Sequence, residues 1–298
     1  MKIYINHTKE DWIIDRLAHE FKNRWPAYTT SDPSKADIIW SLSPAPLVAN
    51  KDVPLITTIH HVDVSKYDPR LYSLIDKGTT HYHTFCSKTK EFMESKSEFT
   101  KGIDVLPYWV NRELWKEESK EECQSLLKLP KDKYIIGSFQ RDTEGSDLVS
   151  PKLSKGPDRF CDYVEKLQSK RGDVHVLLGG WRRQYVISRL EEANIPYTYL
   201  ERPPTTTINT MYNACDLYVV GSRYEGGPQA ILECAITKTP IISTDVGIAS
   251  DILVPMCIID IEKDMYTPTT SDIEYAYIRA SKLCLDNDLG YIDFFKRL

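Results

Sequence analysis

The chain has 298 residues, 41% hydrophobic and 27% charged, which is typical of a globular protein with room for about two domains. Its 38 basic and 43 acidic residues give a formal net charge of -5, and this mild acidity argues against a nucleic-acid partner. No apolar run approaches the roughly 20 residues of a membrane-spanning helix, and the seven scattered cysteines are typical of reduced thiols. We therefore expect a soluble cytoplasmic protein. Peripheral contact with a membrane is compatible with this expectation.

Short apolar runs alternate with stretches of helical period along the whole chain. In the first half, residues 11–24 place apolar side chains on one helical face, and strands are predicted at residues 2–6, 36–41, 54–59, 80–86 and 103–106. In the second half, helical stripes around Phe160 and Ala230 lie between strands predicted at residues 134–139, 174–178, 197–200, 217–220, 240–244 and 256–259. This alternation predicts an α/β fold with parallel sheets, arranged as two doubly wound domains.

The charged stretch 111–133 contains no predicted strand and is interpreted as the seam between the domains. We therefore expect an N-terminal domain at residues 1–115 and a C-terminal domain at residues 116–298. Ser271 and Glu274 have the spacing of a capping box, which predicts a final helix over about residues 272–285. We expect that helix to return toward the N-terminal domain.

The segment from Glu225 to Glu233 follows a predicted buried strand, where open α/β sheets bind ligands. Gly226 and Gly227 allow the backbone to approach a ligand, and Pro228 suits the first position of a helix. A helix starting there aims its free N–H groups at the loop, which favours an anion such as a diphosphate. The two carboxylates lie on the order of 10 Å apart along the helix. A polar loop that merely precedes a helix fits the same spacing equally well.

Several motifs around this segment occur in the order found in glycosyltransferase family 4. Ser222, Glu225, Gly226 and Glu233 resemble that family's donor-site signature, and residues 238–247 resemble its next strand and Gly-containing loop. The resemblance is strong over residues 134–253, moderate over 54–111 and faint before that. It implies a GT-B fold, in which two Rossmann-like domains face each other across a cleft.

The same resemblance implies roles for individual residues in holding a nucleotide-sugar donor. Arg141 and Lys155 resemble the family's two cations on the donor diphosphate, and an arginine fork and a lysine point charge suit a phosphate chemically. The alternatives are a solvated loop charge at Arg141 and a helix-start residue at Lys155. Lys152 is a rival for the second cation, because the interval after Arg141 is longer than usual.

In the family, the glutamates and the glycine loop hold the two ends of the donor. The resemblance implies that Glu225 holds sugar hydroxyls and that Glu233 holds the ribose. The backbone between them would contact phosphate or sugar, through Gly226, Gly227, Pro228, Gln229 and Ala230.

The N-terminal half offers fewer signals. His60 resembles the family's strand-end histidine that faces the transferred sugar; His61 is the alternative, and a purely structural histidine is equally compatible. The glycine-rich loop that the family carries after its first strand is replaced here by Asn6-His7-Thr8-Lys9. Two further clusters are interpreted as non-functional. His81 and His83 fit one strand face better than a pair of metal ligands. The tract Trp181-Arg182-Arg183 is interpreted as solvated, and contact with donor phosphate is the alternative.

The resemblance implies a retaining, metal-independent glycosyltransferase of hexosyl type that needs no cofactor besides its donor. It would move a sugar from a nucleoside-diphosphate sugar to an acceptor hydroxyl on a glycan, a lipid-linked molecule or another compound. A non-catalytic nucleotide-sugar-binding subunit and a GT-B sugar-nucleotide epimerase or hydrolase are the alternatives. The base, the sugar, the acceptor and the oligomeric state cannot be read from the sequence.

Overall fold

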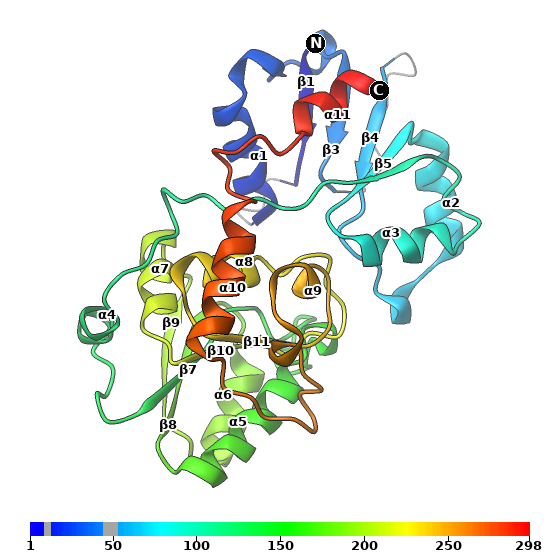
Figure 1. Ribbon diagram of the computed structural model, residues 1–298. Coiled ribbons are helices and arrows are strands. Elements are labelled where there is room, and N and C mark those ends of the chain that lie inside the picture. Colours follow the sequence, from blue (N-terminus) through cyan, green and yellow to red (C-terminus); the bar gives the residue numbers. More distant parts are fainter. Residues whose placement is uncertain (9–12, 44–52) are drawn as a thin grey trace. The chain divides into compact units, whose positions relative to one another are not determined.

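The computed structural model describes residues 1–8, 13–43 and 53–298, which form two α/β units (Figure 1). Unit 1 comprises Met1–Tyr108 and Leu285–Leu298, and unit 2 comprises Trp109–Cys284. The boundary expected between residues 115 and 116 therefore falls inside unit 2. Val110 and Cys284, at the two ends of unit 2, pair through a parallel β-bridge.

Unit 1 is built on a parallel sheet with the strand order β2-β1-β3-β4-β5-β6. Its strands are β1 (Ile3–Asn6), β2 (Thr29–Thr30), β3 (Ile38–Ser41), β4 (Leu55–Thr58), β5 (His81–Thr84) and β6 (Ile103–Val105). Its helices are α1 (Ile13–Arg24), α2 (Pro69–Gly78), α3 (Ser87–Glu94) and α11 (Tyr291–Arg297). Every residue of β3 and β4 is buried, because helices cover both faces of the sheet.

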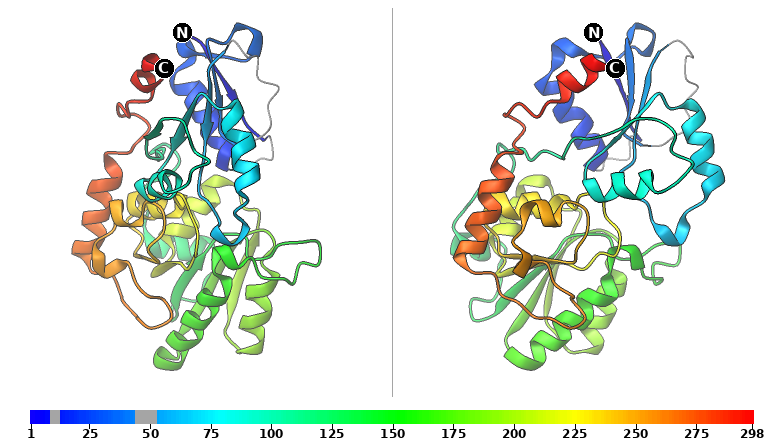
Figure 2. Two further views of the ribbon diagram at one scale, coloured as in Figure 1. Left: turned by 90° about the vertical axis from the view of Figure 1, so that its right-hand side faces the viewer. Right: turned by 45° about the vertical axis from the view of Figure 1, so that its right-hand side comes forward.

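Successive residues of β5 point to opposite faces of this sheet. Their contacts therefore show which side chains pack on each face. Tyr82 packs with Met93 and Phe99 on the face covered by α2 and α3. His83 contacts Tyr291 of α11 on the opposite face, where α1 and α11 lie side by side (Figures 1 and 2). Aromatic rings fill that second layer: Phe21, Trp25, Trp40, Tyr291, Phe294 and Phe295.

A buried polar chain runs through the aromatic layer. The indole N–H of Trp40 donates to the hydroxyl of Thr58 at 2.9 Å, and that hydroxyl lies 3.0 Å from Nδ1 of His83. Nε2 of His83 lies 3.1 Å from the carbonyl of Leu106, which can only accept, so Nε2 carries the proton. Burial lowers the pKa of His83 to about 3. The histidine is therefore a neutral structural residue, as expected from the strand pattern.

Unit 2 contains a second parallel sheet, with the order β11-β10-β7-β8-β9. Its strands are β7 (Tyr134–Ser138), β8 (Val174–Gly180), β9 (Tyr197–Glu201), β10 (Leu217–Val220) and β11 (Ile241–Ser243). Its helices are α4 (Lys120–Leu126), α5 (Pro157–Arg171), α6 (Gln184–Glu192), α7 (Thr205–Asn213), α8 (Gln229–Thr237), α9 (Ala249–Ile252) and α10 (Thr270–Ser281). Adjacent residues again serve opposite faces: Ile136 packs with residues of α5 and α6, whereas Ile135 packs with Cys123 of α4 and Met211 of α7.

The structure differs from the sequence-based expectations in several elements of unit 2 and at the C-terminal end of the chain. Residues 256–259 are not a strand: Pro255–Cys257 forms a 3-10 turn, and only Ile258 makes a bridge, to Ser243. The cap of α10 is Thr269, which forms a capping box with Asp272. The final helix of the chain is α11, which the sequence analysis missed.

A further difference concerns the charged stretch 111–133, which is not a linker. It contains α4 and is tied to α7 by two asparagine side chains. Asn209 accepts the backbone N–H of Lys116 at 3.0 Å, and Asn213 accepts that of Glu118 at 2.8 Å. These bonds satisfy backbone groups that would otherwise need water, so the stretch is an integral part of unit 2.

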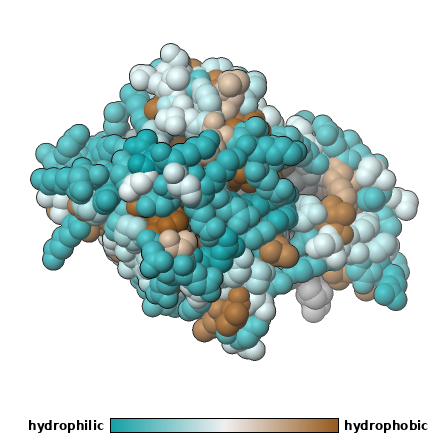
Figure 3. Space-filling view, turned by 90° about the horizontal axis from the view of Figure 1, so that it is seen from below, coloured by the Kyte–Doolittle hydropathy of each residue, from teal (hydrophilic) through white to brown (hydrophobic). Residues whose placement is uncertain are grey.

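All seven cysteines are buried free thiols, as the sequence indicated. Among the described residues, no helix combines the length and the apolar character that crossing a bilayer requires. Seen from below, the surface is mostly hydrophilic, and apolar residues form only small separate patches on that face (Figure 3).

Phe295→Ala is expected to destabilise unit 1 strongly. The ring is buried against Phe21 and Trp40, and removing a buried aromatic side chain typically costs about 3–5 kcal/mol of unfolding free energy. Urea denaturation followed by tryptophan fluorescence measures the loss. Lys296→Ala, at an exposed position of the same helix, is the control and should cost less than about 1 kcal/mol. Equal effects of the two substitutions would contradict the packing assigned to α11.

Candidate functional site

The order of the unit 2 strands reverses at β7. The chain runs from β7 through β8 to β9 on one side, then crosses to β10 and β11 on the other. Ligands of open α/β sheets bind outside the carboxyl ends of the strands at such a reversal. Arg141 follows β7 and Glu225 follows β10, so two of the predicted site residues lie beyond the two strands that flank this point.

The close approach of Gly156 and Gly221 joins the loops that follow β7 and β10. Gly156 adopts the left-handed conformation, with φ 62°, at the start of α5. A Cβ atom there would overlap the carbonyl oxygen of Gly221. Only glycine meets both requirements at once, and this contact carries the preceding Lys155 toward the β10 loop.

Lys155 and Glu225 form an ion pair at this junction. The Glu225 side chain is 9% exposed and that of Lys155 is 25% exposed. The hydroxyl of Ser222 donates to the paired oxygen of Glu225 at 3.1 Å, and the side-chain amide of Gln140 donates to the backbone carbonyl of Lys155 at 2.8 Å. The pair is thus held from both loops in a partly dehydrated place, where charge interactions are stronger than in water.

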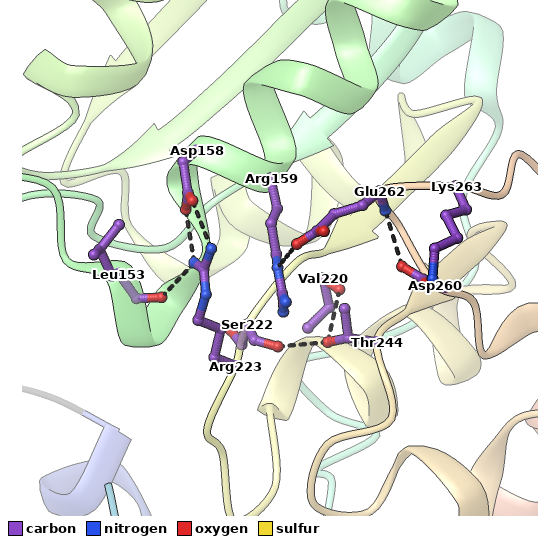
Figure 4. A network of polar contacts seen from close by, with 10 residues as sticks. All are labelled: Leu153, Asp158, Arg159, Val220, Ser222, Arg223, Thr244, Asp260, Glu262 and Lys263. Carbon is purple, nitrogen blue, oxygen red and sulfur yellow. Dashed lines mark hydrogen bonds and ion pairs between the residues drawn. The ribbon is translucent and has the colours of Figure 1, made fainter. Parts of the chain in front are cut away.

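A second link between the same loops is made by Arg223 (Figure 4). Its guanidinium donates to both carboxylate oxygens of Asp158, at 2.8 and 2.6 Å, and to the carbonyl of Leu153 at 2.9 Å. On the other side of the β10 loop, the hydroxyl of Thr244 donates to the carbonyl of Ser222 at 2.6 Å. A bidentate arginine–carboxylate pair fixes geometry as well as charge, so the loop that carries Glu225 is braced on both sides.

The long interval after Arg141 folds into a hairpin. Lys152 donates its backbone N–H to the carbonyl of Asp142 at 2.7 Å, and Thr143 and Pro151 form an antiparallel bridge. The hairpin returns Lys152 to the neighbourhood of Arg141 and Lys155. Burial and the positive charges of these two residues lower the pKa of Lys152 to about 8.

The glycine-rich backbone ahead of α8 is packed against the loop after β11. Gly247 has a φ of 50°, and a Cβ atom there would lie 2.5 Å from the carbonyl oxygen of Gly226. Pro228 caps α8, and Gln229 and Ala230 open it, so the helix begins one residue later than the sequence suggested. The free N–H groups of its first turn therefore lie next to the loop that follows β10.

Glu233 lies in the second turn of α8 and is 5% exposed. The hydroxyl of Tyr212, itself buried, donates to one of its carboxylate oxygens at 2.8 Å. Burial, with the negative charge of Glu233, raises the pKa of Tyr212 well above its usual value. The tyrosine therefore stays a donor and orients the carboxylate.

The interpretation of Arg183 as a solvated residue was wrong, since it is only 1% exposed. Its guanidinium donates to Asp142 at 3.0 Å and to the carbonyl of Gly179 at 2.8 Å, and it also bonds to the carbonyl of Ser138. These groups stand at the carboxyl ends of β7 and β8. Burial raises the pKa of Asp142, while the charge of Arg183 acts in the opposite direction.

His60 belongs to unit 1, whereas the other site candidates belong to unit 2. Its Nε2 is 2.5 Å from the carbonyl of Leu42, and its Nδ1 is 2.6 Å from the hydroxyl of Tyr108. Because a carbonyl only accepts, Nε2 carries the proton and Nδ1 accepts from the tyrosine. Both ring nitrogens thus have partners within unit 1.

Several contributors to the site were given no individual role by the sequence analysis. Ser222 could have been found, because it lies three residues before Glu225 within the quoted motif. Tyr212 and Arg223 gave no such signal, because their partners Glu233 and Asp158 lie 21 and 65 residues away. Within residues 1–8, 13–43 and 53–298, no group of three or more His, Cys, Asp or Glu side chains is placed to hold a metal ion.

The loops described above coincide with a known family pattern. Residues 150–256 match the model of the glycosyl transferases group 1 family. This group 1 segment contains Lys155, Glu225 and Glu233, whereas Arg141 and His60 lie outside it.

Two curated relatives are similar to parts of the chain. The lipopolysaccharide core biosynthesis mannosyltransferase LpsB of Rhizobium meliloti (strain 1021) is 28% identical over 141 residues, 45% of this chain and 38% of LpsB. The putative teichuronic acid biosynthesis glycosyltransferase TuaC of Bacillus subtilis (strain 168) is 24% identical over 205 residues, 65% of this chain and 48% of TuaC. The matches thus span less than half the length of either relative.

The fold is similar to that of solved glycosyltransferases. The crystal structure of Anabaena Alr3699/HepE in complex with UDP-glucose has a TM-score of 0.77 at 12% identity, covering 100% of this chain and 99% of HepE. This likeness, together with the two parallel sheets, confirms the predicted α/β class and GT-B fold.

Arg183→Met is expected to destabilise unit 2, because it leaves the carboxylate of Asp142 buried without its counter-ion. Breaking a buried ion pair from one side typically costs about 3–5 kcal/mol of unfolding free energy, measurable by urea denaturation. The neighbouring, partly exposed Arg182→Met serves as the control, with an expected cost of about 1 kcal/mol. If Arg183→Met were as stable as this control, the ion pair would not hold the ends of β7 and β8.

Proposed function

We propose that the chain is a retaining glycosyltransferase of hexosyl type, which moves a sugar from a nucleoside-diphosphate sugar to an acceptor hydroxyl. The observation that carries the proposal is the Lys155–Glu225 pair at the carboxyl ends of β7 and β10, beside a helix start and within the group 1 segment. A cation for phosphate and a carboxylate for sugar hydroxyls meet there, at the place where this type of sheet binds ligands.

In the proposed reaction, the bond between the sugar and the diphosphate breaks as the acceptor oxygen bonds to the sugar on the same face. The departing diphosphate gains negative charge, which Arg141 and Lys155 stabilise from fixed positions. The leaving phosphate oxygen accepts the acceptor's proton, so no protein nucleophile is needed. These side chains supply positive charge of the kind that a metal ion would otherwise supply, and we therefore propose a metal-independent enzyme.

The other donor contacts follow from the placement of α8. Glu225 would exchange part of its bonding to Lys155 for sugar hydroxyls when Lys155 turns to the phosphate. Glu233, oriented by Tyr212, would accept from the ribose hydroxyls. The backbone from Gly226 to Ala230 would contact phosphate or sugar through its free N–H groups.

The named relatives support a nucleotide sugar as the donor. LpsB is described as a mannosyltransferase, and HepE is seen with UDP-glucose. We propose a glycan or lipid-linked hydroxyl as the acceptor and a cytoplasmic site of action. For His60 to face the sugar, a sugar hydroxyl would have to replace the hydroxyl of Tyr108 at Nδ1.

Incubation with a panel of UDP-, GDP- and ADP-sugars tests the function. Thermal stabilisation by one donor, with slow release of its nucleoside diphosphate and retention of activity in EDTA, is the expected result. Binding without turnover in any acceptor mixture would favour a binding subunit, and conversion of the donor to an isomer would favour an epimerase. Release of nucleotide that no acceptor accelerates would favour a hydrolase.

Arg141→Ala is expected to lower kcat by at least about 100-fold, because one fixed charge on the leaving group is lost. Steady-state release of nucleoside diphosphate measures the effect. Arg70→Ala, at a highly exposed arginine of unit 1, should leave kcat unchanged. An Arg141→Ala enzyme with normal kcat would remove Arg141 from the mechanism.

Glu233→Gln is expected to weaken binding of the donor's nucleoside diphosphate by about 10- to 100-fold, because hydrogen bonds to a charged acceptor contribute about 1.5–3 kcal/mol. Isothermal titration calorimetry measures the affinity. The glutamine can still accept from Tyr212, so the helix should remain folded. Glu192→Gln, at an exposed position of α6, is the matched control. Unchanged affinity in Glu233→Gln would refute the ribose contact.

A further inference from the structure

The hairpin between β7 and α5 adds a third cation to the two that the proposed mechanism uses. Electrostatic coupling links Lys152 to Arg141, Lys155, Glu225 and Glu144. Lys152 and Lys155 are also joined locally, since the N–H of Lys155 donates to the carbonyl of Lys152 at 2.8 Å across one 3-10 turn. In such a turn, side chains three residues apart eclipse one another. Three positive groups therefore gather at the carboxyl end of β7.

The two lysines differ in how their charges are compensated. Lys155 is ion-paired with Glu225. In the part of the chain that the structure describes, Lys152 forms no ion pair, and its amine makes no hydrogen bond. Its charge is nevertheless partly shielded from water. A desolvated ammonium group without a counter-ion is costly, and an incoming dianion would compensate it.

The position of Lys152 is fixed by the hairpin. Its N–H is bonded to the carbonyl of Asp142, and Glu144 and Ser150 are bonded to each other through the backbone at 3.0 Å. Asp142 is in turn held by the buried Arg183. Because this backbone is already ordered, it loses no further freedom when the side chain binds a ligand, which favours affinity.

We propose that Lys152 is a third donor-binding residue, which contacts the diphosphate of the nucleotide sugar together with Arg141 and Lys155. This inference rests on the proposed function and deepens it. Three cations and two carboxylates, Glu225 and Glu144, leave an excess of positive charge, which complements the two negative phosphates of a sugar nucleotide. The hairpin thus supplies a phosphate contact in addition to the pair implied by the family resemblance.

A dependence of affinity on pH follows. A bound diphosphate favours the charged ammonium group, so the pKa of Lys152 rises above about 8 in the complex. Arg141 and Lys155 oppose protonation of Lys152 in the free protein, while Glu225 and Glu144 favour it. Binding therefore takes up a proton above pH 8, and affinity falls by about tenfold between pH 7 and pH 9.

The test is calorimetric titration of the full chain with UDP, GDP and ADP at pH 7 and pH 9. We expect Lys152→Gln to bind the preferred nucleotide about tenfold more weakly than the unmodified chain at pH 7, with little further change at pH 9. Lys152→Arg keeps a charge that does not titrate in this range, and it should bind nearly as tightly at both pH values. Lys170→Gln, at an exposed position of α5, should behave as the unmodified chain, and thermal unfolding checks that each variant is folded.

The outcomes separate this inference from the function on which it rests. If the unmodified chain binds a nucleotide and Lys152→Gln binds it equally well, the inference fails and the proposed function stands. If Lys152→Arg is as weak as Lys152→Gln, the residue acts through its shape and the inference also fails. If the unmodified chain binds none of the nucleotides, the proposed function and the inference fall together.

Discussion

The contact between the backbones of Gly156 and Gly221 is the constraint from which the rest of the candidate site follows. It leaves no room for a side chain at Gly156 and demands a left-handed conformation there. Because this contact joins the loops after β7 and β10, it determines where Lys155 meets Glu225. Arg223 and Thr244 then fix the β10 loop from its two sides. The chemistry of the site therefore depends on a backbone contact that itself contributes no functional group.

Charge is distributed in two layers at this end of unit 2. Arg183 and Asp142 form a buried pair that organises the ends of β7 and β8, and removing either partner would leave a charge without compensation. Beyond them lie Lys155 and Glu225, which are more accessible and can exchange partners with a ligand. The inner pair gives the outer groups a rigid support, which is what electrostatic stabilisation of a leaving group requires.

The sequence predicted the fold well where local patterns determine the structure. Short apolar-rich runs marked ten of the observed strands, but the two-residue β2 is too short to give a pattern. Residues 256–259 are apolar enough for a strand, yet Pro255 starts a 3-10 turn there. The short α11 was missed because its helical character depends on packing against unit 1 rather than on its own period.

In the candidate site, too, local motifs could be predicted from the sequence, whereas tertiary contacts could not. Lys155 and Glu225 were found because their motifs occur in a recognisable order, and the structure brings them into contact. The burial of Arg183 could not be foreseen, because its partner Asp142 lies 41 residues earlier and a guanidinium group is usually exposed. The hydrogen bond from Tyr212 to Glu233 likewise depends on how α7 packs beside α8. Such pairings follow from tertiary structure, which no single motif encodes.

The path of the chain has a consequence for synthesis on the ribosome. Unit 1 is discontinuous: its sheet comes from the first part of the chain, whereas Tyr291 and Phe295, which complete its aromatic layer, come after the whole of unit 2. Domains generally fold as they emerge, beginning at the N-terminus. Until unit 2 has been translated, the face of the unit 1 sheet that α11 completes is covered only by α1. During that interval the nascent chain presents an aggregation-prone surface, so its yield in cells should depend on chaperones that shield this face.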